Sequence, residues 1–367
     1  MSSKEVVIIG GSFAGIAALK ALVKSKDVKL SITVVSPSDK ALFNIGTPRA
    51  TIETEKIDKI FYDVNKAIKT HVSGTIHSGK FIKAYVTEVD LGQQVVYLSN
   101  NETLHYENLI IASGTTTQHP AFKLDNERDS RYTIDAIKGL NKQIKDARKI
   151  AIIGGGPTGV ELAGEIGYEY GSSKSVTLFT GSTQPLPVLS KGLGDKATQK
   201  LQNLHVKVVN NKKSKSYTET TVTFNDGSSE SFDLVIPAFQ LIPNSQFLSN
   251  YPKITDANGF IITDDYLRLK DYPNVIAFGD IVSQGVKSLV DILFGQVGVL
   301  RNTIAYEVFG KKSVTLKAYK QPGTTLIVPI GKGGGVGTAF GLNFPNFAVS
   351  FLKSKDYMIP KGGENLS

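Results

Sequence analysis

The chain has 367 residues, 41% of them hydrophobic, so it exceeds one ordinary domain and provides enough apolar side chains for two or three cores. Its formal net charge of +9 favours anionic partners such as nucleotides, acidic lipids or nucleic acid, although a basic and merely solvated surface is an equal alternative. Because the chain contains no cysteine, disulfides, thiolate metal sites and cysteine nucleophiles are excluded, any redox chemistry must belong to a bound cofactor, and we expect no metal.

Short apolar runs that recur ahead of helical patterns predict the buried parallel strands of βαβ units. The clearest runs are Val6–Ile9, Ile32–Val35, Leu109–Ala112, Ile150–Ile153, Val176–Phe179, Leu234–Pro237 and Val275–Phe278. No apolar run reaches the roughly 18 residues that a membrane helix needs. The first strand also begins too early to leave room for a signal or transit peptide. We therefore expect an α/β fold and a cytoplasmic location, with peripheral contact to a membrane surface left open.

The first strand leads into a glycine-rich loop that runs from Gly10 to Gly15 and opens a helical pattern. Gly10 permits the tight turn and Gly15 permits close packing of the helix on the strand. The free N–H groups and positive dipole of the helix N-terminus suit a pyrophosphate. Ser12 stands where the dinucleotide-binding motif prefers its second glycine, which weakens the match but still lets a phosphate approach.

A second loop, at residues 154–159, forms a complete GxGxxG between the strand Ile150–Ile153 and a helix. This context is the fingerprint of a dinucleotide site, and we expect the nucleotide to be bound by Gly154, Gly156, Thr158 and Gly159. The chain therefore has two nucleotide sites in two domains.

Glu161 and Glu165 lie four residues apart in the helix that follows the second loop, and so share one face of it. Acids in a first helical turn can simply complement the helix dipole. Both interpretations stay open for Glu165, whereas the position of Glu161 closer to the cofactor favours a functional role.

Neither of the two dinucleotide units carries the acid that usually binds the adenosine ribose at the end of the second strand. In the first unit that strand is followed by Ser36-Pro37-Ser38-Asp39, and we expect Ser36 to take the place of the acid, with Asp39 as the alternative. In the second unit the strand ends in Thr180-Gly181-Ser182. No arginine stands there either, so the choice between NADH and NADPH stays open.

Breaks in the strand pattern suggest where the chain crosses between domains. The polar stretch Thr115–Pro120 predicts a crossing into the second domain, and the prolines near residues 243–252 predict the return. The composition changes again after about residue 318, to a glycine-rich loop followed by aromatic residues and lysines. The expected units are residues 1–118 and 249–317 for the first domain, 119–248 for the second, and 318–367 for a small C-terminal domain.

Three later segments resemble two-dinucleotide-binding flavoproteins. The strand that ends in Ala112-Ser113-Gly114 resembles the family's closing strand of the FAD domain, which ends in Ala-Thr-Gly. The second crossing, Asp233–Phe239, has Phe239 where the family usually has Thr or Ser. Gly279-Asp280 resembles the Gly-Asp element whose aspartate accepts a hydrogen bond from the FAD ribityl chain. Taken alone it would be an ordinary N-cap turn, but the order of the motifs favours the flavoprotein.

Further segments resemble the ferroptosis-suppressor branch of apoptosis-inducing-factor-like flavoproteins, with type II NADH dehydrogenases similar in architecture. They are Phe43–Ala50, Val328–Gly331, Gly335–Gly337 and Lys353–Asp356. The resemblance implies two Rossmann-like dinucleotide-binding domains, one for FAD and one for NAD(P)H. The second is inserted in the first, and a small C-terminal α+β domain follows.

The resemblance also implies roles for individual residues. The implied FAD contacts are Ser12, Phe13, Ala14, Arg49, Val86, Ala112, Ser113, Gly114 and Asp280. Lys353 is implied near the flavin, and Glu161 and Glu165 are implied to face the nicotinamide, although Lys353 taken alone would count as one of several solvated lysines.

The activity that this resemblance implies is hydride transfer from NADH or NADPH to a non-covalently bound FAD, followed by delivery of two electrons to an acceptor. A quinone is the implied acceptor. The alternatives are a small acidic iron–sulfur protein, which the basic charge would suit, and nucleic-acid binding through Asn211–Lys215, which we do not expect because aromatic residues hardly interleave with these lysines. Monomer and homodimer stay open.

Two segments near the end of the chain allow further interpretations. The helical pattern Leu289–Arg301 is loosely similar to a helix that lines the quinone entrance in type II NADH dehydrogenases, or is a core helix. The stretch Phe344–Lys353 mixes aromatic residues with lysines, which suits a membrane interface. We favour a packed element that covers the flavin.

Overall fold

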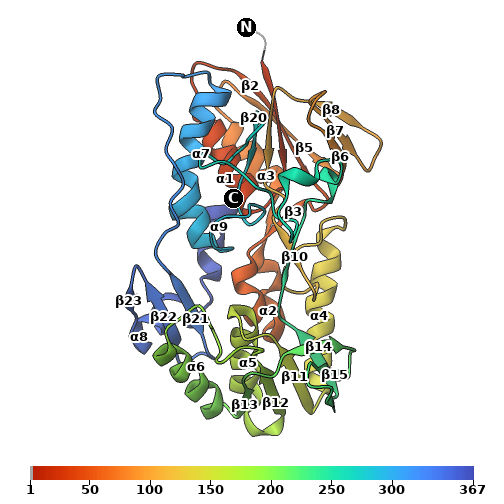
Figure 1. Cartoon of the computed structure of the whole chain (residues 1–367), viewed down its shortest axis with the longest axis vertical. Coiled ribbons are helices and arrows are strands. Elements are labelled where there is room, and N and C mark those ends of the chain that lie inside the picture. Colours follow the sequence, from red (N-terminus) through yellow and green to blue (C-terminus); the bar gives the residue numbers. More distant parts are fainter. Residues whose placement is uncertain (1–2) are drawn as a thin grey trace.

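The computed structural model describes residues 3–367, which form two α/β units one above the other with a C-terminal segment along one side of both (Figure 1). The sheet of the first unit contains, in spatial order, β19 (Arg268–Leu269), β20 (Tyr272–Ala277), β9 (Asn108–Ile111), β1 (Lys4–Ile9), β2 (Leu30–Ser36) and β5 (Ser78–Lys83). All neighbours are parallel except β19 and β20. The sheet of the second unit is wholly parallel and contains β13 (Val206–Val209), β12 (Ser175–Phe179), β11 (Lys149–Ile153) and β17 (Leu234–Pro237). The expected strands are confirmed at all seven positions.

Each sheet is covered by helices on one face and by a small antiparallel sheet on the other. Alternate residues of β1 show this arrangement, because Val6 and Ile8 belong to a core formed with helices whereas Val7 and Ile9 belong to a second core. A strand buried on both faces has no polar side to present, which explains the uninterrupted apolar runs. The helices of this layer are α1 (Phe13–Leu22), α2 (Thr47–Ile52), α3 (Val64–Val72), α4 (Ser130–Asp146), α5 (Pro157–Tyr170), α6 (Lys191–Asn203) and α7 (Val297–Thr303).

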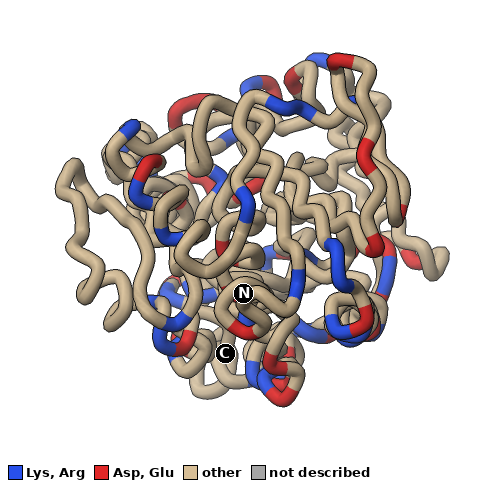
Figure 2. Tube along the Cα trace, turned by 90° about the horizontal axis from the view of Figure 1, so that it is seen from below, with Lys and Arg blue, Asp and Glu red and all other residues tan. Residues whose placement is uncertain are grey.

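The antiparallel layers come from local hairpins. In the first unit they are β6 (Val86–Asp90), β7 (Val95–Leu98) and β8 (Thr103–His105), and in the second β14 (Ser214–Tyr217), β15 (Thr221–Phe224) and β16 (Ser229–Ser231). A further short pair is formed by β3 (Lys40–Leu42) and β4 (Phe61–Asp63). The basic run Asn211–Lys215 is the connection from β13 into β14 and not the tip of a hairpin, and its Lys212 pairs with Glu230. Basic and acidic residues are interspersed in the view of Figure 2.

The chain passes between the units through a two-stranded antiparallel ribbon. Its strands are β10 (Thr115–Thr117), which leaves the first unit, and β18 (Leu241–Pro243), which returns to it. The return therefore starts a few residues before the predicted segment 243–252. The second unit lies between β9 and β20, which are adjacent strands of the first sheet, so it is inserted in the first. The numerical boundaries of the domains stay a prediction.

The C-terminal segment contacts both units. It contains the antiparallel strands β21 (Leu326–Pro329), β22 (Gly335–Ala339) and β23 (Leu342–Asn343), then α8 (Asn346–Val349), a π-helical turn Ser350–Ser354, the 3-10 turn Ile359–Lys361 and α9 (Gly362–Leu366). Strand β21 packs on α5 and β22 packs on α6, whereas α9 packs on α1. Through these contacts the segment joins the second unit to the first.

The predicted helix Leu289–Arg301 is present, with an irregular first part. It starts with π-type turns at Asp291–Gln296, continues as α7 and ends in further π-type turns at Ile304–Val308. Ile292, Val299 and Leu300 are buried in the core of the first unit, which fits the interpretation as a core-facing helix. Among the described residues, no helix is long and apolar enough to span a bilayer.

Candidate active site

A cavity of about 1230 Å³ runs between the two units, and both glycine-rich loops lie on its wall. It also reaches the ends of the crossing strands, the turn at Asp280, the start of the helix near residue 290, and the C-terminal segment at β21 and Lys353. The carboxyl ends of parallel strands next to a chain reversal are the usual ligand sites of open α/β sheets. The cavity contains two such places, one in each unit.

The two loops have the same backbone geometry. Gly10 has φ of +110° and Gly154 has φ of +128°, which side-chain-bearing residues rarely adopt. A Cβ atom on Gly10 would lie 2.3 Å from the carbonyl oxygen of Ala112, and one on Gly154 would lie 2.4 Å from that of Ala238. Only glycine fits at either position. The sequence difference at Ser12 therefore leaves the turn itself unchanged.

The helices that follow these loops have free N-termini directed at the cavity wall. The residues that cap them, Ser12 for α1 and Gly156 for α5, make no side-chain capping hydrogen bond, and both line the cavity. The proline at the start of α5 suits a first helical turn because it lacks the N–H group that has no partner there. Both helix ends can therefore receive a pyrophosphate.

Fifteen of the nineteen residues expected at the site line the cavity. They are Gly10, Ser12, Phe13, Ala14, Ser36, Val86, Ala112, Ser113, Gly114, Gly154, Gly156, Thr158, Glu161, Asp280 and Lys353. Gly15 and Gly159 lie behind the loops, where a Cβ atom would meet the carbonyl oxygens of Gly10 and Gly154 at 1.9 and 2.0 Å. They allow the helix to pack closely on the strand, which is the function the motif assigns to its last glycine. Arg49 and Glu165 are the remaining two.

Glu161 and Lys353 form a buried ion pair on the cavity wall. The Lys353 ammonium donates to the Glu161 carboxylate at 2.6 Å and to the carbonyl oxygen of Ile327 at 3.1 Å. Burial raises the pKa of the Glu161 carboxyl above its ordinary value, and the charge of Lys353 opposes that rise. The pair joins α5, β21 and the C-terminal turn, so three segments that are distant in sequence meet at this point of the cavity.

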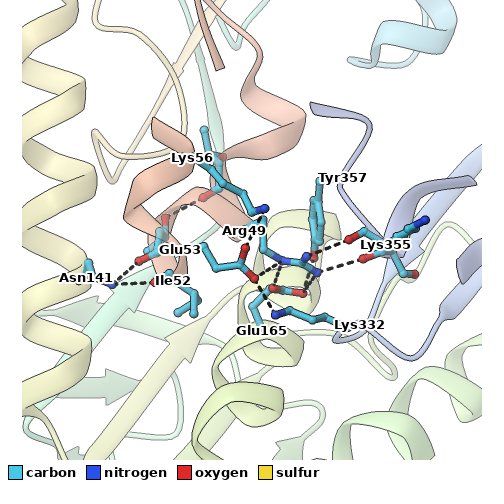
Figure 3. Close-up of polar contacts among 12 residues, drawn as sticks. Arg49, Ile52, Glu53, Lys56, Asn141, Glu165, Lys332, Lys355 and Tyr357 are labelled. Carbon is cyan, nitrogen blue, oxygen red and sulfur yellow. Dashed lines mark hydrogen bonds and ion pairs between the residues drawn. The ribbon is translucent and has the colours of Figure 1, made fainter. Parts of the chain in front are cut away.

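Arg49 and Glu165 form a second buried ion pair outside the cavity lining (Figure 3). Their side chains are 1% and 2% exposed, and the Arg49 guanidinium donates to both carboxylate oxygens. It also donates to the carbonyl oxygens of Ser354 and Lys355 at 3.0 and 3.2 Å. The Tyr357 hydroxyl donates to the same carboxylate at 3.2 Å. In this structure Arg49 and Glu165 therefore contact each other and the C-terminal segment. Neither residue lines the cavity, where the resemblance implied contacts with FAD and with the nicotinamide.

The contacts of this second pair connect α2, α5 and the C-terminal segment. Burial raises the pKa of the Glu165 carboxyl, and its hydrogen bonds to Arg49 oppose the rise. Glu53, which follows α2, forms ion pairs with Lys332 at 2.8 Å and with Lys56 at 3.0 Å. Asn141 of α4 donates to the carbonyl oxygens at the end of α2. The short helix α2 is thus held on several sides by polar contacts (Figure 3).

Asp280 has a partner that the sequence did not indicate. Lys123 donates to its carboxylate at 2.6 Å and to the Thr115 hydroxyl at 2.6 Å, and both Lys123 and Thr115 line the cavity. No local motif marks Lys123, because it meets Asp280 only through the path of the crossing segment. A lysine here holds the carboxylate at the turn where the resemblance expects the ribityl chain.

The backbone next to Asp280 is fixed from behind by a buried hydrogen-bonded chain. The N–H of Gly279 donates to the side-chain oxygen of Gln296 at 2.8 Å, and the amide of Gln296 donates to Asp291 at 2.8 Å. Tyr319 completes the chain with a hydrogen bond to Asp291 at 2.7 Å. Burial and the carboxylate of Asp291 raise the pKa of the Tyr319 hydroxyl. This residue therefore stays a neutral donor at physiological pH.

The residues of the cavity fit a flavin dinucleotide in the first unit. Its first loop presents an uncapped helix end to a pyrophosphate, and Ser36 lies at the end of β2, where a ribose would be expected. Asn244 lies on the wall beside Ser113 and holds it by hydrogen bonds at 2.7 and 2.9 Å. The side-chain oxygen of Asn244 is buried without a hydrogen-bond partner within residues 3–367. A bound hydroxyl or N–H group would satisfy this oxygen.

Comparisons with known proteins agree with this geometry. The profile of the pyridine nucleotide-disulphide oxidoreductase family matches residues 4–293. The oxidoreductase ptaL of Pestalotiopsis fici is 31% identical over 95% of this chain and 95% of its own length. Ferroptosis suppressor protein 1 of Xenopus tropicalis is 29% identical over 99% and 96%, and that of Homo sapiens is 27% identical over 97% and 94%.

Solved structures share the fold at low sequence identity. The sulfide:quinone oxidoreductase of Aquifex aeolicus superposes with a TM-score of 0.79 at 15% identity and covers 99% of this chain and 92% of that chain. NDH2 of Plasmodium falciparum in complex with NADH has a TM-score of 0.75 at 16% identity and covers 100% and 98%.

Proposed function

This chain belongs to the pyridine nucleotide-disulphide oxidoreductase family of FAD-dependent NAD(P)H oxidoreductases, and from that premise we propose that it oxidises NADH or NADPH and delivers the two electrons to a quinone. The observation that carries the proposal is the single cavity that contains both nucleotide loops and opens onto an apolar wall. Because the chain has no cysteine, a cysteine relay between the flavin and an acceptor is excluded.

Bound FAD supplies the redox chemistry, because the isoalloxazine accepts a hydride from the nicotinamide and returns two electrons to an acceptor. The protein has to place the two rings in contact and exclude water from them. The first loop and Asp280 hold the flavin nucleotide, and the second loop holds the nicotinamide nucleotide. The Glu161–Lys353 pair lies on the same wall and fixes the C-terminal segment to α5 beside the cavity.

The apolar side chains on the cavity wall indicate the chemical class of the acceptor. It is formed by the start of the helix near residue 290 and by β21, through Leu289, Val290, Leu293, Phe294, Leu326 and Ile327. Phe294 is largely exposed, and its ring lies 6.3 Å from that of Phe340. A planar, weakly polar quinone ring fits such a wall better than the acidic surface of an iron–sulfur protein. One solved structure with the same fold is a sulfide:quinone oxidoreductase, and another is NDH2 in complex with NADH.

The test is anaerobic reduction and reoxidation of the purified protein. The FAD-loaded protein should lose its flavin absorbance on addition of NADH or NADPH, and a water-soluble quinone should restore it faster than a reducible iron–sulfur protein does. Protein that takes up no FAD, or whose flavin is not bleached by either nucleotide, would overturn the oxidoreductase proposal. Bleaching followed by reoxidation through the iron–sulfur protein alone would overturn the quinone.

We further propose that the protein takes its quinone from a membrane, and that it contacts the membrane surface through the C-terminal segment. Large apolar side chains project from the C-terminal segment, with Phe347 75% and Phe351 83% exposed, and with Phe340 and Leu342 also exposed. Lys332 and Lys355 lie beside the two phenylalanines around a shallow hollow. Aromatic residues flanked by lysines suit the interface between lipid headgroups and acyl chains.

Vesicles that contain a long-chain quinone test this contact. Replacing Phe347→Ser and Phe351→Ser together should lower turnover with vesicle-borne quinone by about tenfold or more, because about 2 kcal/mol of apolar contact is lost for each exposed ring that inserts. Turnover with the water-soluble quinone should stay unchanged. A matched control replaces two exposed isoleucines on other surfaces, Ile76→Ser and Ile262→Ser. Equal loss with both quinones, or no loss with vesicles, would contradict the proposed contact.

A further inference from the structure

The edge of the second sheet where β12 and β13 end is the place at which the adenosine ribose of the nicotinamide nucleotide is expected. In a βαβ dinucleotide unit the residue at the end of the second strand contacts this ribose, and β12 is that strand for the loop at Gly154. Thr180 and Ser182, which follow β12, line the cavity. An acid at this point would bind the ribose hydroxyls and repel a 2′-phosphate. The chain instead has Thr180-Gly181-Ser182.

The loop that follows β13 is attached directly to this segment. The N–H of Thr180 donates to the carbonyl oxygen of Val209 at 3.0 Å, and its hydroxyl contacts the side chain of Asn210 at 3.0 Å. The N–H of Asn211 donates to the carbonyl oxygen of Ser182 at 2.8 Å. These bonds fix the start of the basic run against the end of β12. The start of the basic run therefore lies next to Thr180 and Ser182, which line the cavity.

Two neighbouring lysines of this loop differ in what they contact. Lys212 donates to Glu230 at 2.7 Å and lies 4.1 Å from the centre of the Phe224 ring. Lys213 is exposed and lies over Gly181, because a Cβ atom on Gly181 would be 3.9 Å from both its Cα and its Cγ atom. Among residues 3–367, no carboxylate comes within 4.0 Å of the Lys213 ammonium. Lys213 is therefore available to an external anion.

The absence of a side chain at Gly181 leaves room for that anion. Gly181 is exposed and has φ of +65°, so the chain turns away there between the half-buried Ser182 and the buried Thr180. A phosphate placed next to Gly181 would have Lys213, whose Cα and Cγ atoms lie over Gly181, and Ser182, the next residue in the chain, as its neighbours. Lysine is a common phosphate ligand because its ammonium is a compact charge with three donors.

We propose that NADPH is the preferred nicotinamide substrate and that Lys213 and Ser182 bind its 2′-phosphate. The proposal rests on the proposed NAD(P)H oxidoreductase function and adds the identity of the reductant. Lys213 is a specificity-determining residue in this arrangement, since it lies beside Gly181, at the adenosine end of the nucleotide. It should change binding of the phosphate and leave the hydride-transfer step intact.

The test compares both nucleotides on the FAD-loaded enzyme and on its variants. Wild type should have a higher kcat/KM with NADPH than with NADH. Lys213→Ala should lower kcat/KM for NADPH by about tenfold, chiefly through KM, because one charge-assisted hydrogen bond to the phosphate is lost. Lys213→Glu should lower it further. Neither variant should change kcat/KM for NADH by more than about twofold. The matched control is Lys215→Ala, an exposed lysine of β14 in the same basic run.

A fragment probe separates binding of the phosphate from turnover. Adenosine 2′,5′-bisphosphate, which carries the 2′-phosphate, should inhibit wild type competitively and more tightly than adenosine 5′-monophosphate, and Lys213→Ala should remove that difference. A wild-type preference for NADH, or an equal loss for both nucleotides in Lys213→Ala, would overturn this assignment. Flavin bleaching by NADH would still occur in that case, whereas failure of the proposed function would abolish bleaching by both nucleotides.

Discussion

Replacing Lys353→Met is expected to slow flavin reduction by NADPH by about 100-fold, the loss typical of reacting groups displaced by about 1 Å. The reason is that Lys353 joins Glu161 to the carbonyl oxygen of Ile327, so its loss removes the contact that fixes the C-terminal segment to α5 at the cavity wall. Stopped-flow absorbance of the flavin under anaerobic conditions measures the rate. The matched control is Lys355→Met, whose exposed side chain is two residues away. A rate like that of wild type would contradict the positioning role.

The pH dependence of the same rate distinguishes this positioning role from general damage to the structure. Burial raises the pKa of Glu161 above its ordinary value of 4.5, and its ion pair with Lys353 exists only while this carboxyl is ionised. The rate should therefore fall as the pH decreases through a pKa above 4.5. In Lys353→Met no lysine remains to be released when Glu161 is protonated, so the acid limb should disappear. In Glu161→Gln the limb should disappear, and an unchanged limb would contradict the assignment.

Replacing Arg49→Met is expected to lower the free energy of unfolding by about 3–5 kcal/mol, because it leaves the Glu165 carboxylate buried without a cation. Replacing Glu165→Leu in addition should recover most of this loss, since an apolar pair is often as stable as a buried ion pair. Urea denaturation followed by circular dichroism measures both variants. The control is Lys191→Met, which breaks an ion pair whose partners are 83% and 61% exposed. We expect a change of about 1 kcal/mol or less there.

A variant of Arg49 also tests whether this residue contacts FAD, as the family resemblance implies, or only pairs with Glu165. Its guanidinium is occupied by Glu165 and two backbone carbonyls and does not line the cavity. The double variant Arg49→Met with Glu165→Leu should therefore bind FAD with an affinity within about threefold of wild type, since it loses no charged hydrogen bond to the cofactor. Equilibrium titration of the apoprotein measures this affinity. A much larger loss in a folded double variant would restore the direct FAD contact.

The parts of the fold that could be predicted are those whose signal is local. In strand β1, Val6–Ile9 is an uninterrupted apolar run because both faces are buried there, and the turn after it needs glycine because Ala112 approaches closely. Both features can be recognised from a few consecutive residues of the sequence. Strand β5 was missed because it lies at the edge of the sheet, and its Ser78–Lys83 sequence is largely polar and exposed.

The polar partners in the site could not be predicted because they come from distant parts of the chain. Glu161 and Lys353 were each named, yet only the packing of β21 on α5 brings them into contact. Lys123 cannot be predicted from the sequence, since nothing near it along the chain marks a site. In the sequence Lys213 is only one member of a basic run, and its relation to Gly181 depends on the parallel pairing of β12 with β13. The packing and pairing of distant elements thus determine which charged side chains lie close together.

The insertion of the second unit between β9 and β20 also determines the order in which the two halves can form during synthesis. All four strands of the second sheet lie between residues 149 and 237, so this sheet is complete in one continuous stretch of nascent chain. The first sheet has to wait for β20, and its turn at Asp280 follows later still. Because domains fold as units during synthesis, we expect the inserted half to fold on the ribosome while the flavin half is unfinished. Capture of FAD then becomes a late event, and a cell short of flavin would accumulate chains in which only the nicotinamide half is folded.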